Sequence, residues 1–260
     1  MDHNVSYTSN ASNGYVGREP DGSEARYGRR RTLAFVVPAM ALPLCASLVY
    51  FVLLAGSTVA MVIYAATKVF TVAWPAFVAF AVEGSRFARG GVEWRKHLAA
   101  LPLGIMTGLL IGSVIIGGYS LEPIGDYARG FRDAITTKVT EMGISEPVPY
   151  VVFCIFLAGL HSLIEEFFWR WYVFGRLIKV VRRGTAYLAA SFAFAAHHYV
   201  LLGCYFSMVG TVIFGTCVAI GGALWCWMYR RQSTLAGSWI SHALVDVAIF
   251  YVGYHLIFTP

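Results

Sequence analysis

The sequence predicts an all-α fold: a polytopic membrane helical bundle of about seven transmembrane helices, with a polar site at mid-membrane depth. Its 260 residues are 58% hydrophobic and only 13% charged, which is too apolar for a soluble domain. Its apolar runs are long enough to cross a bilayer, which takes about 20 residues each. Three of the runs also carry ionisable residues near their middles, where such residues are costly and rare.

The apolar runs predict seven spans. They are Leu33–Leu54, Ser57–Val82, Leu98–Tyr119, Tyr150–Ile178, Thr185–Tyr205, Ser207–Tyr229 and Thr234–Ile257. The first two are separated only around Gly56, so one long bent helix is the alternative there. Between Leu121 and Pro149 the apolar residues recur at helical spacing, which predicts an amphipathic helix on the membrane surface. The pairs Gly117-Gly118 and Gly221-Gly222 predict close helix packing.

Three regions follow from this layout. Residues 1–31 form a polar tail that we expect to be disordered and cytosolic, because it is rich in Ser, Asn and Gly. Residues 32–148 hold the N-terminal transmembrane helices and the amphipathic segment, and residues 149–260 hold the helices that carry the polar residues. All five cysteines lie in apolar stretches and form no Cys-x-x-Cys pair, so we interpret them as packing residues.

The basic residues predict the orientation of the bundle. Threading seven spans places 15 of the 20 Lys and Arg on the side of the N-terminus. Only Arg129, Arg132 and Lys138 fall on the other side. The positive-inside rule then predicts a multi-pass protein of the cell membrane with a cytosolic N-terminus and the C-terminus opposite. The net charge of +6 is thereby explained by the lipid bilayer as partner, and we expect no nucleic acid.

Glu165, Glu166 and Arg170 form the densest group of charges within a span. Glu166 and Arg170 are four residues apart on one helix face, so they can pair and neutralise each other. Glu165 points about 100° away and cannot share that arginine well. A buried carboxylate of this kind either stays protonated or finds a histidine, and both states suit a general base. The alternative is an ionic cluster that only stabilises helix packing.

Histidines on other spans can complete a site. His198 is the expected partner of Glu165, whereas the adjacent His197 should face elsewhere as a packing residue. His242 and Asp246 are four residues apart, so the carboxylate can orient the imidazole toward a substrate or, alternatively, only join helices.

Two further residues are less specific. His161 lies one turn before Glu165, where it could line the mouth of the cavity, bind zinc or simply pack. Lys68, near the middle of the second span, is expected to snorkel or to pair with a carboxylate.

Three motifs in order, on successive apolar helices, resemble the CPBP family, which includes type II CAAX prenyl endopeptidases and bacteriocin-processing or Abi proteins. The motifs are Glu165-Glu166-x-x-x-Arg170, Phe194-x-x-x-His198 and His242-x-x-x-Asp246. The resemblance covers roughly Tyr150 to the C-terminus and implies an intramembrane endopeptidase of the glutamate type. It implies that Glu165 and His198 activate a water, that His242 and Asp246 stabilise the oxyanion, and that Glu166 and Arg170 shape the site.

One position departs from part of the family. Prenyl-protein members favour Asn at the last motif position, where this chain has Asp246. An ionised Asp cannot donate a hydrogen bond. Orienting His242 is therefore a better-supported role for it than binding the oxyanion.

The expected substrate is a peptide or protein, which prenyl-protein members take in lipid-modified form. We expect no cofactor. Zinc held by His198, His242 and either Glu165 or His161 is the less favoured alternative, because using Glu165 as a ligand leaves no obvious carboxylate base. The competing class is a non-proteolytic membrane protein, such as an immunity factor, scaffold or transporter, that retains the polar core.

Overall fold

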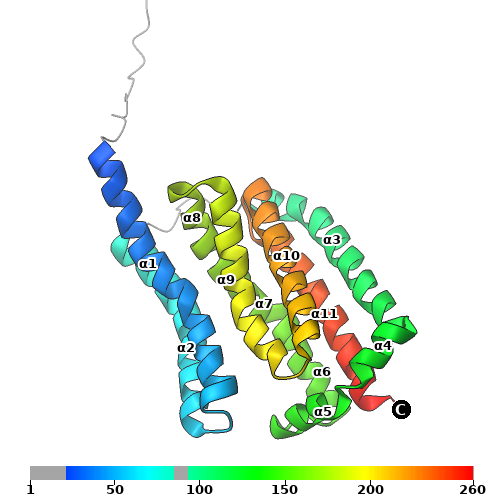
Figure 1. The fold of residues 1–260 in the computed structure, drawn as a ribbon. Coiled ribbons are helices and arrows are strands. Elements are labelled where there is room, and N and C mark those ends of the chain that lie inside the picture. The colour runs from blue at the N-terminus through cyan, green and yellow to red at the C-terminus, as the bar shows by residue number, and fades with distance from the viewer. Residues whose placement is uncertain (1–21, 85–92, 260) are drawn as a thin grey trace, which may run out of the picture.

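The computed structural model describes residues 22–84 and 93–259, and the regular structure in these two ranges is entirely helical (Figure 1). Seven helices there are long and apolar enough to cross a membrane. They are Gly28–Leu53, Thr58–Val82, Trp94–Ser120, Pro147–Val180, Arg183–Gly203, Met208–Gln232 and Ala236–Phe258. The prediction of a seven-span all-α bundle is confirmed.

The first two spans form a hairpin at one edge of the bundle (Figure 1). Helix α1 (Gly22–Leu48) ends in the π-helical segment η1 (Val49–Leu53), and α2 (Thr58–Phe77) ends in the π-helical segment η2 (Val78–Val82). Between them Gly56 has φ +78°, and the side chain of Ser57 accepts a hydrogen bond from the backbone N of Ala60 at 3.1 Å, capping α2. The two spans are therefore separate helices, and the alternative of one long bent helix is wrong.

Helix α1 begins well before the predicted start at Leu33. Gly22 to Arg31, assigned to the polar tail, are its first three turns. Disorder is thus the wrong prediction for this part of the tail, because the apolar stretch behind it extends the helix outward. Residues 1–21, where the rest of the predicted disordered tail falls, lie outside the described residues.

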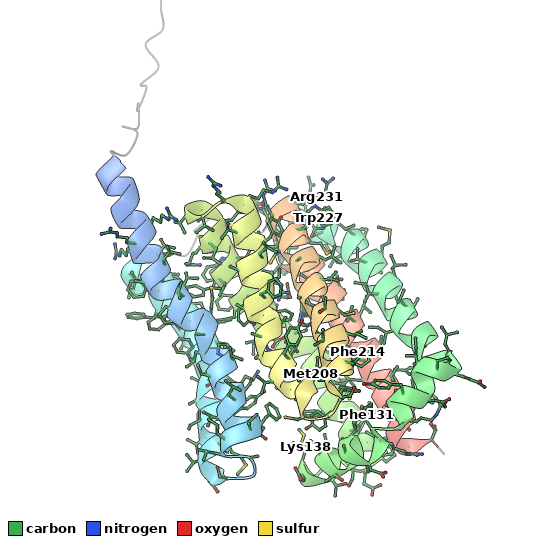
Figure 2. All side chains as sticks on the ribbon, in the orientation of Figure 1. Phe131, Lys138, Met208, Phe214, Trp227 and Arg231 are labelled. Carbon is green, nitrogen blue, oxygen red and sulfur yellow. The ribbon has the colours of Figure 1, made fainter. Side chains whose placement is uncertain are left out.

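The segment after α3 (Trp94–Ser120) contains two short helices instead of the single predicted one. They are α4 (Glu122–Arg129) and α5 (Arg132–Glu141), and they meet at Gly130 and Phe131. The ring of Phe131 packs 5.0 Å from that of Phe206, which in turn lies 5.0 Å from Phe214, so the pair is held against the end of the bundle (Figure 2).

Helices α3 and α11 (Ala236–Phe258) pack most closely of all. A Cβ on Gly104 would lie 2.3 Å from Cγ2 of Ile240, and one on Gly108 would lie 2.8 Å from Cβ of Leu244. These glycines four residues apart let the two backbones approach. Of the two glycine pairs predicted to allow close packing, Gly117-Gly118 does not, since a Cβ on Gly117 would meet nothing within 4 Å. The pair Gly221-Gly222 does, since a Cβ on Gly222 would lie 3.1 Å from Cδ1 of Phe194 on the preceding span.

The fourth span is the central one. It consists of α6 (Pro147–Phe156), η3 (Leu157–His161), α7 (Ser162–Glu166), η4 (Phe167–Phe174) and α8 (Gly175–Val180), where η3 and η4 are π-helical. Helices α9 (Arg183–Gly203) and α10 (Met208–Gln232) pack side by side in front of it in Figure 1, while α1, α2 and α11 also contact it. This arrangement places Glu165 and Glu166 inside the bundle.

The outer faces are apolar and the ends are charged. Large aliphatic side chains such as Val62, Leu110 and Ile220 are more than 60% exposed, as expected of surfaces that face lipid. Arg231 and Lys138 lie at opposite ends of the bundle (Figure 2). The end with Arg231 also carries α8 and the start of α1, whereas the end with Lys138 carries α4 and α5 (Figure 1).

Candidate active site

Two π-helical segments frame the pair of acids on the central span. Such segments insert an extra residue into a helix, and they recur at functional sites. The carbonyl oxygen of Gly159 in η3 accepts hydrogen bonds from Nε1 of Trp239 at 2.9 Å and from Oγ of Ser162 at 3.1 Å. Because Trp239 belongs to α11, this contact aligns the central span with the helix that carries His242.

Glu166 is held by two partners and is fully buried. Its Oε1 lies 2.9 Å from Nη1 of Arg170 and 2.9 Å from Nδ1 of His242. The Arg170 guanidinium, itself fully buried, lies 4.3 Å above the ring centre of Phe194 and 4.9 Å above that of Trp225. The ion pair expected from the i, i+4 spacing is present, and the rings add cation–π attraction.

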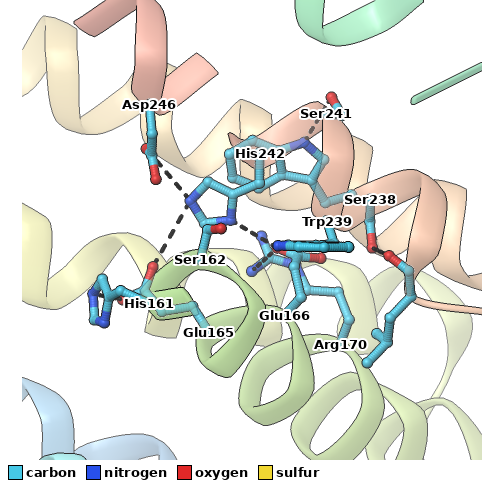
Figure 3. A network of polar contacts seen from close by, with 12 residues as sticks. His161, Ser162, Glu165, Glu166, Arg170, Ser238, Trp239, Ser241, His242 and Asp246 are labelled. Atoms are coloured by element: carbon cyan, nitrogen blue, oxygen red, sulfur yellow. Dashed lines mark hydrogen bonds and ion pairs between the residues drawn. The ribbon is translucent and has the colours of Figure 1, made fainter. Parts of the chain in front are cut away.

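His242 connects the two acids (Figure 3). A carboxylate can only accept, so the Nδ1 that faces Glu166 carries a hydrogen. Its Nε2 lies 3.8 Å from Oε2 of Glu165 and 3.7 Å from Oδ1 of Asp246. The ring of Trp225 stacks on the imidazole with centroids 4.0 Å apart. The imidazole is therefore oriented by Glu166 and Trp225, and not by Asp246 as the spacing suggested.

Asp246 does not make the hydrogen bond to His242 that an orienting residue would make. At 3.7 Å its carboxylate is beyond direct hydrogen-bond length from Nε2, and it is on the side of the imidazole that faces Glu165. The reason is that Glu166, from the neighbouring helix, already occupies Nδ1.

Glu165 is surrounded by histidines from three elements. Its Oε1 lies 3.3 Å from Nε2 of His161 and 3.6 Å from Nε2 of His197, and His242 approaches its other oxygen. The residue is only 8% exposed and has no arginine or lysine within ion-pair distance among the described residues. The prediction that histidines, and not Arg170, accompany Glu165 agrees with this geometry.

The two adjacent histidines of α9 differ from expectation. Nδ1 of His198 is 3.0 Å from the carbonyl oxygen of Phe194, so this nitrogen carries a hydrogen and Nε2 is left as an acceptor. His197, expected to face elsewhere, is close to Glu165. The two rings lie 4.1 Å apart, because both long side chains reach toward the same carboxylate from neighbouring positions.

Glu165, His197 and His198 each offer a donor atom, and these atoms lie within 4.8 Å of one another. One carboxylate and two imidazoles are a donor set that zinc accepts, so these residues fit a metal ion. The predicted zinc ligands included His242 instead of His197. His242 is directed at Glu166, so the nitrogen of His197 is the one that lies close to Glu165 and His198.

A pocket connects this group to the α1–α2 hairpin. Its walls include Glu165, His161 and His197 on one side and residues of α1 and α2, among them Lys68, on the other. Glu165 is therefore the buried acid that an incoming molecule can reach, whereas Glu166 is enclosed.

Residues 147–248 match the family model described as type II CAAX prenyl endopeptidase Rce1-like. This domain belongs to that family. The matched range contains every site residue predicted from the sequence, whereas the α1–α2 wall of the pocket lies outside it. Neither a curated protein nor a solved structure matches the chain.

The match of residues 147–248 to the Rce1-like family supports a CAAX-type intramembrane protease in general, with a peptide or protein substrate in a membrane. It does not favour the competing class of immunity factor, scaffold or transporter. The seven apolar helices and the family together make it a multi-pass membrane protein.

Sequence reasoning missed two tryptophans that build the site. Trp239 precedes His242 by three residues and so shares its helix face, a signal that the spacing offered. Trp225 is on α10, which carries no ionisable residue at mid-span, and only the packing of α10 against α11 brings it to His242.

Proposed function

We propose that the protein is a glutamate-type intramembrane endopeptidase in which Glu165 is the general base. The observation that carries the proposal is the contrast between the two adjacent acids. Glu166 is closed in by Arg170 and His242, while Glu165 lines a pocket and, among the described residues, has histidines as its only ion-pair partners. A carboxylate in this setting is available to take a proton from water.

In the proposed reaction a water binds between Glu165 and the histidines of α9. Glu165 takes one proton as the water oxygen attacks the scissile carbonyl carbon. When the tetrahedral intermediate collapses, the C–N bond breaks and the proton passes from Glu165 to the leaving amine. The acceptor Nε2 of His198, left free because Nδ1 donates to Phe194, can hold the other hydrogen of the water.

His242 has the position to stabilise the oxyanion. In the proposed reaction both imidazole nitrogens carry a hydrogen, because Nδ1 donates to Glu166 and Nε2 faces the acceptor oxygens of Glu165 and Asp246. Nε2–H then points into the gap between Glu165 and Asp246. A donor fixed in place before the reaction, in a site that excludes bulk water, is what stabilises developing negative charge.

The proposed substrate is the C-terminal segment of a membrane-anchored protein. A C-a-a-X sequence carries a prenyl group on its cysteine and ends in a free carboxylate. Apolar residues on both sides of the pocket, such as Pro43 and Ala46 of α1 and Phe168 of the central span, suit its aliphatic residues.

The test is cleavage of a quenched fluorescent C-a-a-X peptide by purified protein in lipid nanodiscs. Glu165→Gln keeps the side-chain volume and removes the base, so kcat should fall by at least about 100-fold. Glu122→Gln on the surface helix α4 is the matched control and should retain wild-type activity. Both variants should elute as the wild type does in size-exclusion chromatography. A fully active Glu165→Gln would refute the assignment.

A metal ion bound by Glu165, His197 and His198 would supply a Lewis acid and a bound hydroxide. We propose that the reaction proceeds without one, because a ligated Glu165 would leave no other carboxylate in the wall of this pocket to act as the base, and Glu166 is enclosed by Arg170.

A further inference from the structure

The pocket beside Glu165 contains one cation, Lys68 of α2. The other walls combine apolar residues, such as Pro43 and Phe168, with uncharged polar ones, such as Thr67 and Thr71. The free volume is about 30 Å³, so a bound peptide has to widen the gap between the hairpin and the central span. Helix α2 lies at the edge of the bundle, packed against α1, η4 and α7 (Figure 1).

Lys68 has no acidic partner within ion-pair distance among the described residues, and its ammonium group lies 5.0 Å from the ring centre of Tyr64. It is ten residues from the start of the span at Thr58 and further from its end at Val82. At about 1.5 Å per residue, the nearer end is about 15 Å away, which exceeds the length of a lysine side chain. A charged lysine at this depth is costly unless it has a function.

The substrate of a CAAX protease has one obligatory negative charge near the cleaved bond. Three residues follow the prenylated cysteine, and an extended chain advances at most about 3.6 Å per residue. The terminal carboxylate therefore lies within about 11 Å of the scissile bond, in the region that Glu165 and Lys68 share.

We propose that Lys68 binds the C-terminal carboxylate of the substrate and so makes the enzyme selective for cleavage next to a free C-terminus. The inference rests on the proposed function of Glu165. Lys68 is a specificity-determining residue in this scheme: it contributes to binding and takes no part in proton transfer. A charge-assisted hydrogen bond in a water-poor pocket corresponds to about a 10- to 100-fold difference in binding.

The test compares two peptides that differ only in the C-terminal group, which is a free carboxylate in one and a carboxamide in the other. Wild-type enzyme should cleave the acid with a kcat/KM about 10- to 100-fold higher, chiefly through a lower KM. For the Lys68→Met variant, kcat/KM for the acid peptide should fall to the value for the amide peptide, while kcat/KM for the amide peptide should change little. Lys68→Arg should restore part of the preference.

Lys138→Met is the matched control, because Lys138 also lies over an aromatic ring, that of Tyr50, but is on α5 outside the pocket. It should keep the wild-type preference. Equal cleavage of both peptides by the wild type overturns the inference and leaves the protease function standing. The inference is also overturned if the Lys68→Met variant still prefers the acid peptide, or if it loses cleavage of the amide peptide as well. Cleavage of neither peptide by the wild type overturns the proposed function and this inference together.

Discussion

The buried pair of Glu166 and Arg170 yields a quantitative prediction about stability. Arg170→Met keeps most of the side-chain volume and removes the guanidinium. It leaves Glu166 as a fully buried carboxylate whose Oε2 already has no hydrogen-bond donor among the described residues. Breaking a buried ion pair in this way costs about 3–5 kcal/mol, and the lost cation–π contacts with Phe194 and Trp225 add to it.

The double variant Glu166→Gln/Arg170→Met separates charge from packing. It has no unpaired charge, and replacing both members of a buried pair is often close to neutral. We therefore expect it to be more stable than Arg170→Met by about 3 kcal/mol, although it carries one substitution more. At about 2–4 °C per kcal/mol for a chain of this size, the difference in melting temperature is about 10 °C.

The assay is the loss of monodisperse protein in detergent after heating, followed by fluorescence-detected size-exclusion chromatography. The double variant should be folded but poorly active, because the neutral amide that replaces the Glu166 carboxylate would no longer hold a protonated His242. A double variant no more stable than Arg170→Met would refute the reasoning, as would a single variant with wild-type stability. Either result would mean that the charge of Glu166 is not compensated by Arg170.

Three further predictions concern metal, packing and orientation. Activity should survive EDTA or phenanthroline, with substoichiometric zinc in purified protein; stoichiometric metal lost and regained together with activity would assign it to Glu165, His197 and His198. Gly108→Leu should destabilise the bundle by at least about 1–3 kcal/mol through overpacking against α11, whereas Gly117→Leu, where a Cβ meets nothing within 4 Å, should cost far less in the same heating assay. A reporter fused to the C-terminus should be found on the side opposite the cytosol, and digestion of a C-terminal tag only from the cytosolic face would contradict the proposed orientation.

The sequence was sufficient to predict the seven spans and the ion pair of Glu166 with Arg170. Both depend on local properties: the apolar length of each run and the i, i+4 spacing on one helix. It was also sufficient to separate Glu165 from that pair, because adjacent residues on a helix point in different directions.

The contacts between helices could not be predicted in the same way. The segments η3 and η4 depart from the 3.6-residue repeat, so positions computed on an ideal helix shift across them. His242 and Asp246 share a face as expected, yet Glu166 from another span binds the imidazole more closely. Likewise, His197 and His198 are equivalent in the sequence, and only the approach of α9 to the central span brings His197 within 3.6 Å of Glu165.

The site therefore depends on giving two neighbouring carboxylates opposite surroundings. Glu166 is neutralised by Arg170, and its remaining hydrogen-bonding capacity orients His242. The other nitrogen of this imidazole faces Glu165. A positive charge on His242 would therefore attract both the enclosed Glu166 and the accessible Glu165. An enzyme that only needed a buried ion pair would have no use for the second acid. The position of Glu165, between the pocket and three histidines, is what the proposed reaction requires, because there a proton has to leave a molecule bound in the pocket.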